Sequence, residues 1–197
     1  MARRRSNSVA RRTTAYLGYG TPLMRPHRGE CIGTASLVNS PPQPLRNGII
    51  PAILDLNNAH AAELSWLTAA QLTALLDKAF YARQISDGDA FLLAFDQKAI
   101  YESPNYLWFR ERYRQFVYID RVVVSPLMRG HGYARALYIN LFAHAREEGH
   151  TLVVCEVNCE PPNRVSDAFH AAMQFTEVGR TQIHHGSKTV RYMAREL

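Results

Sequence analysis

The chain has 197 residues, of which 47% are hydrophobic, a formal net charge of +6 and three cysteines. This length and apolar content predict one domain with a substantial core, and the odd cysteine count without a C-x-x-C pair argues against a disulfide framework and a zinc site. No apolar run is long enough to span a membrane, and the N-terminus lacks the apolar core of a secretory signal, so we expect a cytoplasmic protein without a membrane partner.

The positive charge belongs to the N-terminal part of the sequence. Residues 1–50 hold eight of the 23 basic and one of the 17 acidic side chains, which leaves 15 basic and 16 acidic side chains from residue 51 onward. Residues 1–48 are rich in Arg, Ser, Thr, Gly and Pro and show no periodicity, which predicts a disordered extension without a role in the chemistry. A mitochondrial transit peptide is an alternative, whereas a nucleic-acid-binding arm is not expected.

From residue 49 the composition becomes that of a folded domain, which we expect to span residues 49–197. The stretch IIPAILDL (49–56) predicts a short strand, and NNAHAAELSWL (57–67) a helix that begins with an Asn cap. Thr68 is predicted to cap a second helix, in which leucines recur at helical spacing.

The middle of the chain alternates between strands and glycine-bearing turns. Residues 83–95 (RQISDGDAFLLAF) predict two strands around an Asp-Gly turn. They are followed by an aromatic, charged insertion, ESPNYLWFRERY (102–113), and by a long strand, QFVYIDRVVV (115–124). The strand ends in a Ser-Pro break and a loop with two glycines.

The C-terminal part continues the alternation. A helix with an apolar stripe from Ala134 to Ala145 should end near Gly149. The strand TLVVCEVN (151–158), a helix from Arg164 to Met173 and a closing hairpin follow. This order predicts an α/β or α+β domain with one central mixed sheet.

The loop before the first of these helices reads Arg129, Gly130, His131, Gly132, Tyr133 and Ala134. Amides at a helix start have no intrahelical partners, so with the helix dipole and Arg129 they are suited to a phosphate or pyrophosphate. The glycines allow unusual backbone angles and remove Cβ atoms that would block an anion. The alternative is a tight turn without a ligand, since the loop lacks the Walker ending and the third glycine of the Rossmann fingerprint.

The pattern R-x-x-G-x-A, preceded by VVVSP and followed by an amphipathic helix and a Cys-Glu-Val-Asn strand, resembles the acetyl-CoA-binding core of the GNAT family of N-acetyltransferases. The family signature, [Q/R]-x-x-G-x-[G/A], falls on Arg129, Gly132 and Ala134. PPNRVSDAFHAAMQF (161–175) is similar to the family's second cofactor segment. The resemblance covers residues 49–197 and implies a mixed, mostly antiparallel sheet that is splayed at the cofactor site and flanked by helices.

The resemblance implies acetyl-CoA as co-substrate and no metal. Backbone groups of Val122, Val123 and Val124 would pair with the pantetheine arm, and an amide of this strand would polarise the thioester carbonyl. The amides of residues 129–134 would hold the pyrophosphate, and Asn163 would contact the arm from the other side of the opening.

Acetyl transfer needs a neutral amine and a proton for the departing thiolate. The family's proton donor is usually a Tyr seven residues after the Asn, a position held here by His170. We expect His170 to line a cleft, either as the acid or without transferring a proton, away from the helix's buried stripe of Val165, Phe169, Ala172 and Met173.

Glu156 and Asp120 are the candidates for the general base. Strand alternation places Asp120 on one face with its neighbours two residues away, Tyr118 and Val122, and places Glu156 with Val154 and Asn158. Glu156, acting through a water, is our first choice. The alternative for either carboxylate is a pair with Arg121 or another basic side chain.

Substrate recognition is expected from the aromatic insertion, with Tyr106, Trp108 and Arg110 as candidate substrate-binding residues in a lid. Ordinary packing of an amphipathic helix is the alternative. Gln174 stands where the family usually has Gly, which leaves the geometry of that helix end open.

The sequence thus predicts an acetyl-CoA-dependent N-acetyltransferase acting on an amine of a small molecule, an amino acid or a peptide or protein. The alternatives are a non-catalytic acyl-CoA-binding or sensory domain and, less favoured, nucleic-acid binding through the arm. For the oligomeric state, a homodimer is one possibility.

Overall fold

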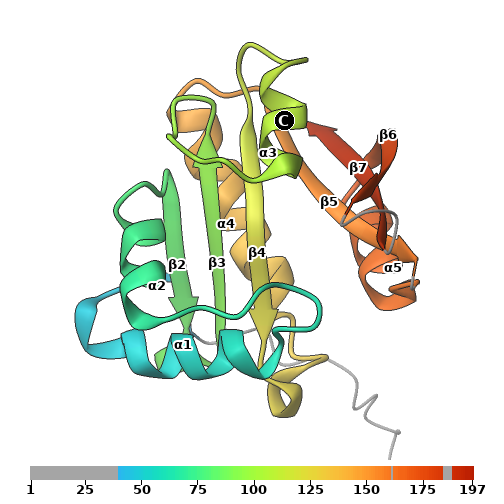
Figure 1. Cartoon of the computed structure of the whole chain (residues 1–197). Helices are drawn as coiled ribbons and strands as arrows, with labels where there is room; N and C mark the ends of the chain where they lie inside the picture. Colours follow the sequence, from blue (N-terminus) through green and yellow to red (C-terminus); the bar gives the residue numbers. More distant parts are fainter. Residues whose placement is uncertain (1–39, 161, 184–187) are drawn as a thin grey trace, which may run out of the picture. The chain divides into compact units, whose positions relative to one another are not determined.

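A computed structural model of the chain describes residues 40–160, 162–183 and 188–197. One seven-stranded sheet in the order β1-β2-β3-β4-β5-β7-β6 forms its centre (Figure 1). The strands are β1 (Gln43–Pro44), β2 (Tyr81–Ile85), β3 (Ala90–Asp96), β4 (Val117–Val124), β5 (Leu152–Glu160), β6 (Thr176–Ile183) and β7 (Lys188–Glu196). The helices are α1 (Ile50–Ala59), α2 (Ala69–Leu76), α3 (Pro104–Arg110), α4 (Tyr133–Glu147) and α5 (Arg164–Ala172).

The sheet is mixed and mostly antiparallel, which confirms the predicted fold class. Only β4 and β5 pair in parallel, and every other neighbouring pair is antiparallel. Because β1 pairs with β2 through Gln43 and Pro44, the sheet begins upstream of residue 49. Most of the predicted extension (residues 1–39) and the predicted hairpin loop at 184–187 lie outside the described residues. In the described ranges no helix has both the length and the apolarity to cross a membrane.

Helices cover both faces of the sheet. In Figure 1, α1 and α3 lie in front of the strands and α4 lies behind them. Alternation along β3 supplies both cores: Leu92 and Ala94 pack with α4, whereas Leu93 and Phe95 pack with the aromatic residues of α3. Since β3 is apolar on both faces, it occupies the interior of the sheet.

A β-bulge at Asp120 is the feature that shapes the functional part of the sheet. Leu93 of β3 pairs with Arg121 and the next residue, Ala94, pairs with Ile119, so that Asp120 is the extra residue. A bulge bends and twists a strand. In keeping with this, β4 pairs with β5 only at Val117 and Tyr118, and beyond this point its β5 side has no ladder partner in the described chain.

The bulge also overturns one prediction. We expected Tyr118, Asp120 and Val122 to share a face, but Tyr118 packs in the core beside α3 and Val122 packs in the core beside α4. The extra residue shifts the alternation by one, so side chains on the two sides of Asp120 exchange faces.

The predicted strand at residues 49–56 is wrong, because residues 50–59 form α1. Pro51 lies in the first turn, where its missing N–H costs no helical hydrogen bond. Ile53 and Asn57, one turn apart, are the buried residues of this helix. A short apolar run by itself does not distinguish a strand from a buried helix.

The predicted helix at residues 57–67 is also wrong beyond residue 59, where turns begin. Asn58 does not cap a helix. Instead its side chain holds the backbone of Leu67 through two hydrogen bonds of 2.9 Å each. The predicted cap at Thr68 is confirmed, since its hydroxyl accepts from the Gln71 amide and the Gln71 side chain accepts from the Thr68 amide.

The buried face of α5 differs from the prediction. Val165, expected in the buried stripe, is 82% exposed, whereas His170 is only 5% exposed and packs among aromatic rings. The inward face contains Ser166, His170 and Met173, which recur at helical spacing. A short helix over an aromatic core can bury a histidine whose nitrogens both find partners.

The geometry at the C-terminal end of α5 determines the backbone conformation of Gln174. The residue has φ of +63°, its amide donates to Ala171 O at 2.9 Å, and the Phe175 amide donates to His170 O at 3.0 Å. These two bonds form a Schellman motif, in which glycine is the preferred residue at this position. Gln174 thus adopts a left-handed backbone conformation that favours glycine.

We therefore expect Gln174→Gly to raise the free energy of unfolding by about 1 kcal/mol, because glycine avoids the steric cost of the left-handed conformation. Denaturant unfolding measures the difference. Gln174→Ala is the matched control and should bring no gain, since alanine keeps the Cβ. Equal effects of the two substitutions would show that backbone strain is not relieved at this position.

Candidate active site

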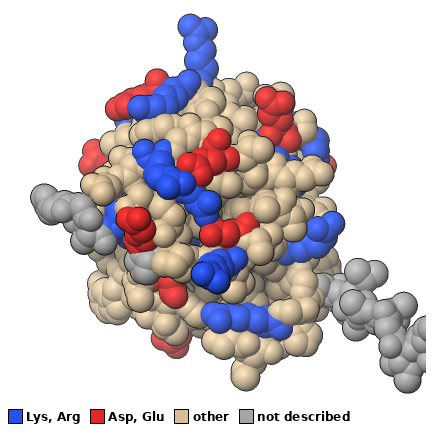
Figure 2. Space-filling model, turned by 90° about the vertical axis from the view of Figure 1, so that its right-hand side faces the viewer, with Lys and Arg blue, Asp and Glu red and all other residues tan. Residues whose placement is uncertain are grey.

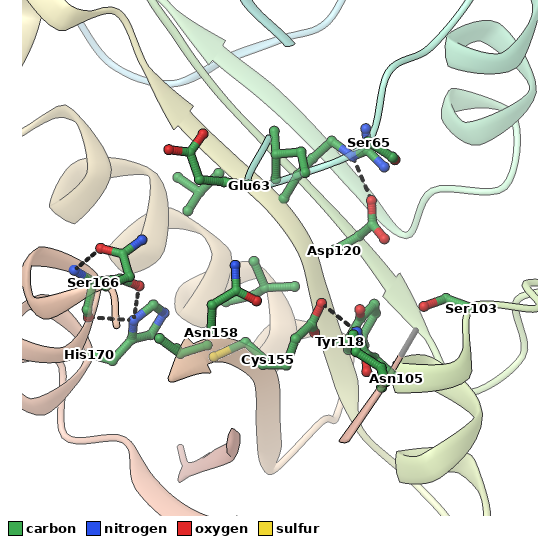
Figure 3. Close-up of a pocket in the computed structure, with 18 of the residues that line it drawn as sticks. Glu63, Ser65, Ser103, Asn105, Tyr118, Asp120, Cys155, Asn158, Ser166 and His170 are labelled. Atoms are coloured by element: carbon green, nitrogen blue, oxygen red, sulfur yellow. Dashed lines mark hydrogen bonds and ion pairs between the residues drawn. The ribbon is translucent and has the colours of Figure 1, made fainter. Parts of the chain in front are cut away.

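A cavity of about 400 Å³ opens where β4 and β5 separate. Residues 119–122 of β4 and 155–158 of β5 form its two walls. The N-cap residue Asn163 and, from α5 itself, Ser166 and His170 also line it. Figure 3 shows His170 on one side of this cavity and Tyr118, Asn105 and Asp120 on the other. The splay of the sheet and the predicted catalytic residues therefore meet in one place.

Glu156 lies in the wall formed by β5. Its Oε1 accepts a hydrogen bond of 3.0 Å from Asn105 Nδ2, while its Oε2 is buried and has no hydrogen-bond partner in the described residues. Burial raises the pKa of Glu156 to about 7, against the opposing effect of the nearby Tyr118 hydroxyl. A carboxyl with this pKa exchanges a proton near neutral pH, which is the property required of a general base.

Asp120, the other candidate base, is committed to an ion pair. Its Oδ2 accepts from Arg121 Nε at 2.6 Å, and its Oδ1 accepts from the Tyr101 hydroxyl at 2.6 Å. Arg121 also donates to Asn57 Oδ1 at 2.8 Å, and both members of the pair are buried. The pair holds the bulge of β4 to α1, so Asp120 has a structural role at the cavity wall.

His170 forms two hydrogen bonds that fix its tautomer. Nδ1 lies 2.8 Å from Ser166 O, a carbonyl that can only accept, so Nδ1 carries the proton. Nε2 lies 2.9 Å from the Tyr138 hydroxyl and therefore accepts from it. Burial lowers the pKa of His170 and so favours the neutral ring, in which both nitrogens have hydrogen-bond partners.

The glycine loop presents a helix start to solvent. Gly132 is the N-cap of α4 with φ of +83°, and Gly130 has φ of +82°. The space next to the Cα of Gly130 is open. The first turn of α4 contains no acidic side chain, so its amides and the positive end of the helix dipole are free of a competing internal carboxylate. Residues 129–132 are exposed.

These features fit a nucleotide-bearing co-substrate. The loop offers anion-binding amides, and the adjoining β4 edge from Ile119 to Val124 offers backbone groups with no ladder partner on the β5 side in the described chain. Asn163 lines the cavity while its Oδ1 caps α5 by accepting from the Ser166 amide at 3.1 Å. No three potential metal-ligating side chains gather in the parts of the chain that the structure describes.

The structure does not bring the predicted substrate-binding residues into the cavity. Tyr106 is fully buried and donates to Asp96 O at 2.8 Å. Trp108 stacks on Tyr192 with ring centroids 4.1 Å apart, and Arg110 is exposed beside the Tyr106 ring. None of the three lines the cavity. Packing of an amphipathic helix explains these residues, and α3 instead contributes Pro104 and Asn105 to the wall.

Sequence reasoning missed the polar partners of the two central side chains. Tyr138 on α4 and Asn105 on α3 come from elements far from His170 and Glu156 in the sequence. Tyr138 belongs to the apolar stripe predicted for its helix, and Asn105 to the insertion expected to recognise substrate, where only Tyr106, Trp108 and Arg110 are predicted site residues. A tyrosine in an apolar helix stripe gave no local signal, because its partner is decided by how α4 packs against α5.

Comparisons with known proteins agree with this geometry. Residues 8–175 match the model of the acetyltransferase (GNAT) family. A search of curated proteins found no match. Many solved structures share the fold.

Three of these solved structures illustrate the similarity. The ribosomal-protein-S18-alanine N-acetyltransferase from Escherichia coli is 15% identical with a TM-score of 0.60, over 80% of this chain and 93% of that one. NAA60 from Arabidopsis thaliana, solved with a bisubstrate analogue, is 14% identical with a TM-score of 0.64, over 80% and 98%. The protein yncA from Salmonella typhimurium, solved with its cofactor acetyl-CoA, is 17% identical with a TM-score of 0.59, over 81% of this chain and 94% of that one.

Since the family model covers most of the sequence and the sheet, splay and glycine loop are all in place, the chain belongs to the GNAT family of acetyltransferases.

Proposed function

We propose that this protein transfers the acetyl group of acetyl-CoA to an amine, with Glu156 as general base. The observation that carries the proposal is a buried carboxylate with a pKa of about 7 and a free oxygen, inside the cavity between β4 and β5. Bound acetyl-CoA supplies the activated acetyl group as a thioester. The residues of the chain must then bind the acceptor, remove its proton and provide a proton for the departing thiol.

Glu156 performs the first proton transfer in this account. Oε2 accepts a proton from the acceptor's ammonium, directly or through a water, while Asn105 holds Oε1. The Glu156 carboxylate, which forms no salt bridge within the described residues, also favours binding of a cationic amine when it is ionised. The acceptor is therefore a protonated amine, and a peptide N-terminus and a small-molecule amine both satisfy this description.

The Tyr138–His170 pair stands on the opposite wall. His170 has no proton to give at Nε2, because that nitrogen accepts from Tyr138. We therefore place the proton donor at the pair: the Tyr138 hydroxyl gives the departing thiolate the proton that it otherwise donates to His170 Nε2, and His170 positions this hydroxyl. Amide formation releases a second proton from the acceptor nitrogen, which restores the Tyr138 hydroxyl, while the first proton, taken by Glu156, leaves to solvent. Asn163 and the amides of residues 129–134 complete the proposed co-substrate site.

Tyr138→Phe is expected to lower kcat about 10-fold or more, because a proton donor for the leaving thiol is lost, while the Kd for acetyl-CoA stays nearly unchanged. The matched variant His170→Gln should lower kcat by a similar factor, and the double variant should be no worse than either single one. Steady-state kinetics with a thiol-detecting reagent measures these values. Additive losses in the double variant would contradict a shared function of the pair.

The test of the proposed function is CoA release from acetyl-CoA by the full chain, recorded with a panel of peptides that have free N-termini and a panel of small primary amines. Acceptor-dependent thiol release, with a mass increase of one acetyl group on the acceptor, is the expected result. Acetyl-CoA binding without acceptor-dependent release from either panel would favour the alternative, a non-catalytic acyl-CoA-binding domain.

The surface in Figure 2 does not favour nucleic-acid binding. On the side that carries β6, β7 and α5 in Figure 1, basic and acidic side chains alternate, and Arg180 pairs with Glu177 at 3.2 Å. A nucleic-acid site would require a continuous basic surface. The Arg-rich residues 1–39 lie outside the described residues.

A further inference from the structure

A second cleft, of about 250 Å³, lies between α4, the C-terminal end of α5 and the end of β7. Arginines line it from two elements, Arg135 and Arg146 from α4 and Arg195 from β7. No acidic side chain lines it, and within residues 40–160, 162–183 and 188–197 none of the three arginines forms a salt bridge. Its lining residues are all different from those of the acetyl-transfer cavity.

Arg195 is held rigidly at this cleft. Its Nη1 donates to Met173 O at 2.6 Å, and its guanidinium lies 4.2 Å from the centre of the Phe142 ring. Its Nε is buried and has no hydrogen-bond partner in the part of the chain that the structure describes. A buried donor without a partner costs free energy unless a ligand or water satisfies it. Burial and the nearby Arg146 and Arg135 lower the pKa of Arg195.

Ordinary structural roles explain only part of this cluster. Arg146 lies in the last turn of α4, where a cation is stabilised by the helix dipole. Arg135 lies in the first turn, where the dipole disfavours a cation, and its only recorded hydrogen bond among the described residues is a weak one to Met173 Sδ at 3.7 Å. Other arginines, such as Arg180 and Arg191, have carboxylate partners. Nor does excess basicity explain the cluster, since the chain from residue 51 onward holds 15 basic and 16 acidic side chains.

We propose that Arg135, Arg146 and Arg195 bind a small multivalent anion, an organic phosphate or a polycarboxylate, at a site separate from the acetyl-transfer cavity. Guanidinium groups form paired, charge-assisted hydrogen bonds with both kinds of anion. The size of the cleft suits a small molecule, and its floor of Phe142 and Met173, with the half-exposed Ile139 beside it, suits an anion that carries an apolar part. The inference is independent of the proposed acetyl transfer, because it concerns binding alone.

The experiment is calorimetric titration of the full chain with inorganic pyrophosphate and with citrate at constant ionic strength, in the presence of saturating CoA. CoA occupies the glycine loop, so that remaining anion binding reports on the second cleft. Saturable binding of at least one anion is expected, and acetate, a monovalent control, should give no saturable heat. Comparing pyrophosphate with citrate distinguishes a phosphate site from a carboxylate site.

The double variant Arg135→Gln/Arg146→Gln should weaken this binding at least about tenfold, because it removes two charge-assisted contacts. Arg180→Gln, a change at an exposed arginine with a carboxylate partner, is the matched control and should leave the affinity unchanged. Arg195 is kept, since it also holds the end of α5.

Three outcomes would overturn the proposal: no saturable binding of either anion, unchanged affinity in the double variant, or binding that is seen without CoA and abolished by saturating CoA. Complete competition would assign the three arginines to the co-substrate site. Absence of CoA binding in the same titration would count against the proposed function, and the loss of affinity in the double variant would then be the result that assigns the anion to the second cleft and not to the glycine loop.

Discussion

Glu156→Gln is expected to lower kcat/KM for acetyl transfer about 100-fold, which is the usual contribution of a positioned general base. Glutamine preserves the volume of the side chain and the Oε1 atom that accepts from Asn105, so the cavity wall should keep its geometry. Only the capacity to take a proton is lost. Acetyl-CoA affinity, measured by calorimetry, should remain close to that of the wild type.

The pH profile separates this chemical role from a structural one. Because the pKa of Glu156 is raised to about 7, wild-type kcat/KM should rise with pH through this region as the carboxyl loses its proton. The glutamine variant should lack that limb and keep only the titration of the acceptor. An unchanged rate, or a limb near pH 7 that persists in the variant, would contradict the assignment of Glu156 as base.

The free energy of unfolding should fall with rising pH, whereas kcat/KM rises. In the unfolded chain Glu156 ionises near its ordinary pKa of 4.5, whereas in the folded protein it keeps its proton up to about pH 7. The folded state therefore binds more protons between these values, and the free energy of unfolding falls as pH rises through the window. Thermal unfolding should show Glu156→Gln to be more stable than the wild type at pH 8, with the difference shrinking toward pH 4.

Gly132→Glu is expected to weaken acetyl-CoA binding by at least about 100-fold, because a carboxylate at the helix start competes for the amides and repels the pyrophosphate. Gly132 has φ of +83°, so any side chain there also strains the backbone. Gly132→Ala carries the same strain without the charge and should lose much less affinity.

Folding of both variants is compared by thermal unfolding, since the shared backbone strain should lower both melting temperatures by a similar amount. A glutamate variant that is folded and binds acetyl-CoA like the alanine variant would show that the α4 N-terminus does not hold the pyrophosphate. The co-substrate would then have to bind by other groups.

Local signals predicted much of the sheet and the glycine loop. Thr68 and Gln71 lie at capping-box spacing, the Asp87-Gly88 pair marks the turn between β2 and β3, and Gly149 follows the last turn of α4 with φ of +79°. Each of these residues acts on neighbours within a few positions of the chain, so the cap or turn that it forms can be predicted from the local sequence.

Features that depend on long-range packing were not predictable in the same way. The bulge at Asp120 follows from the register between β3 and β4. β4 contains no glycine or proline that would indicate a bulge in the sequence. The burial of His170 depends on Tyr138, 32 positions away. The apolar run at residues 49–56 is compatible with both a strand and a helix, and only the packing of Ile53 in the folded structure distinguishes them.

The residues of the candidate site also fall into those that the local sequence identifies and those whose role depends on long-range contacts. The signature residues of the glycine loop were identifiable because a family pattern fixes their spacing, and Glu156 was identifiable as a carboxylate within an apolar strand. Which of the two carboxylates is free could not be read from the sequence. Arg121 follows Asp120 directly, but only the folded structure shows that its guanidinium turns back to bind that carboxylate.

The measurement that tests the account most directly is calorimetric titration of the full chain with acetyl-CoA, beside acetyl-pantetheine, which has the same thioester and arm but no pyrophosphate. The account predicts saturable binding of one acetyl-CoA per chain and affinity at least about tenfold lower for acetyl-pantetheine, because the amides of the α4 N-terminus lose their anion. Equal affinity for both ligands, or no binding of acetyl-CoA, would contradict it.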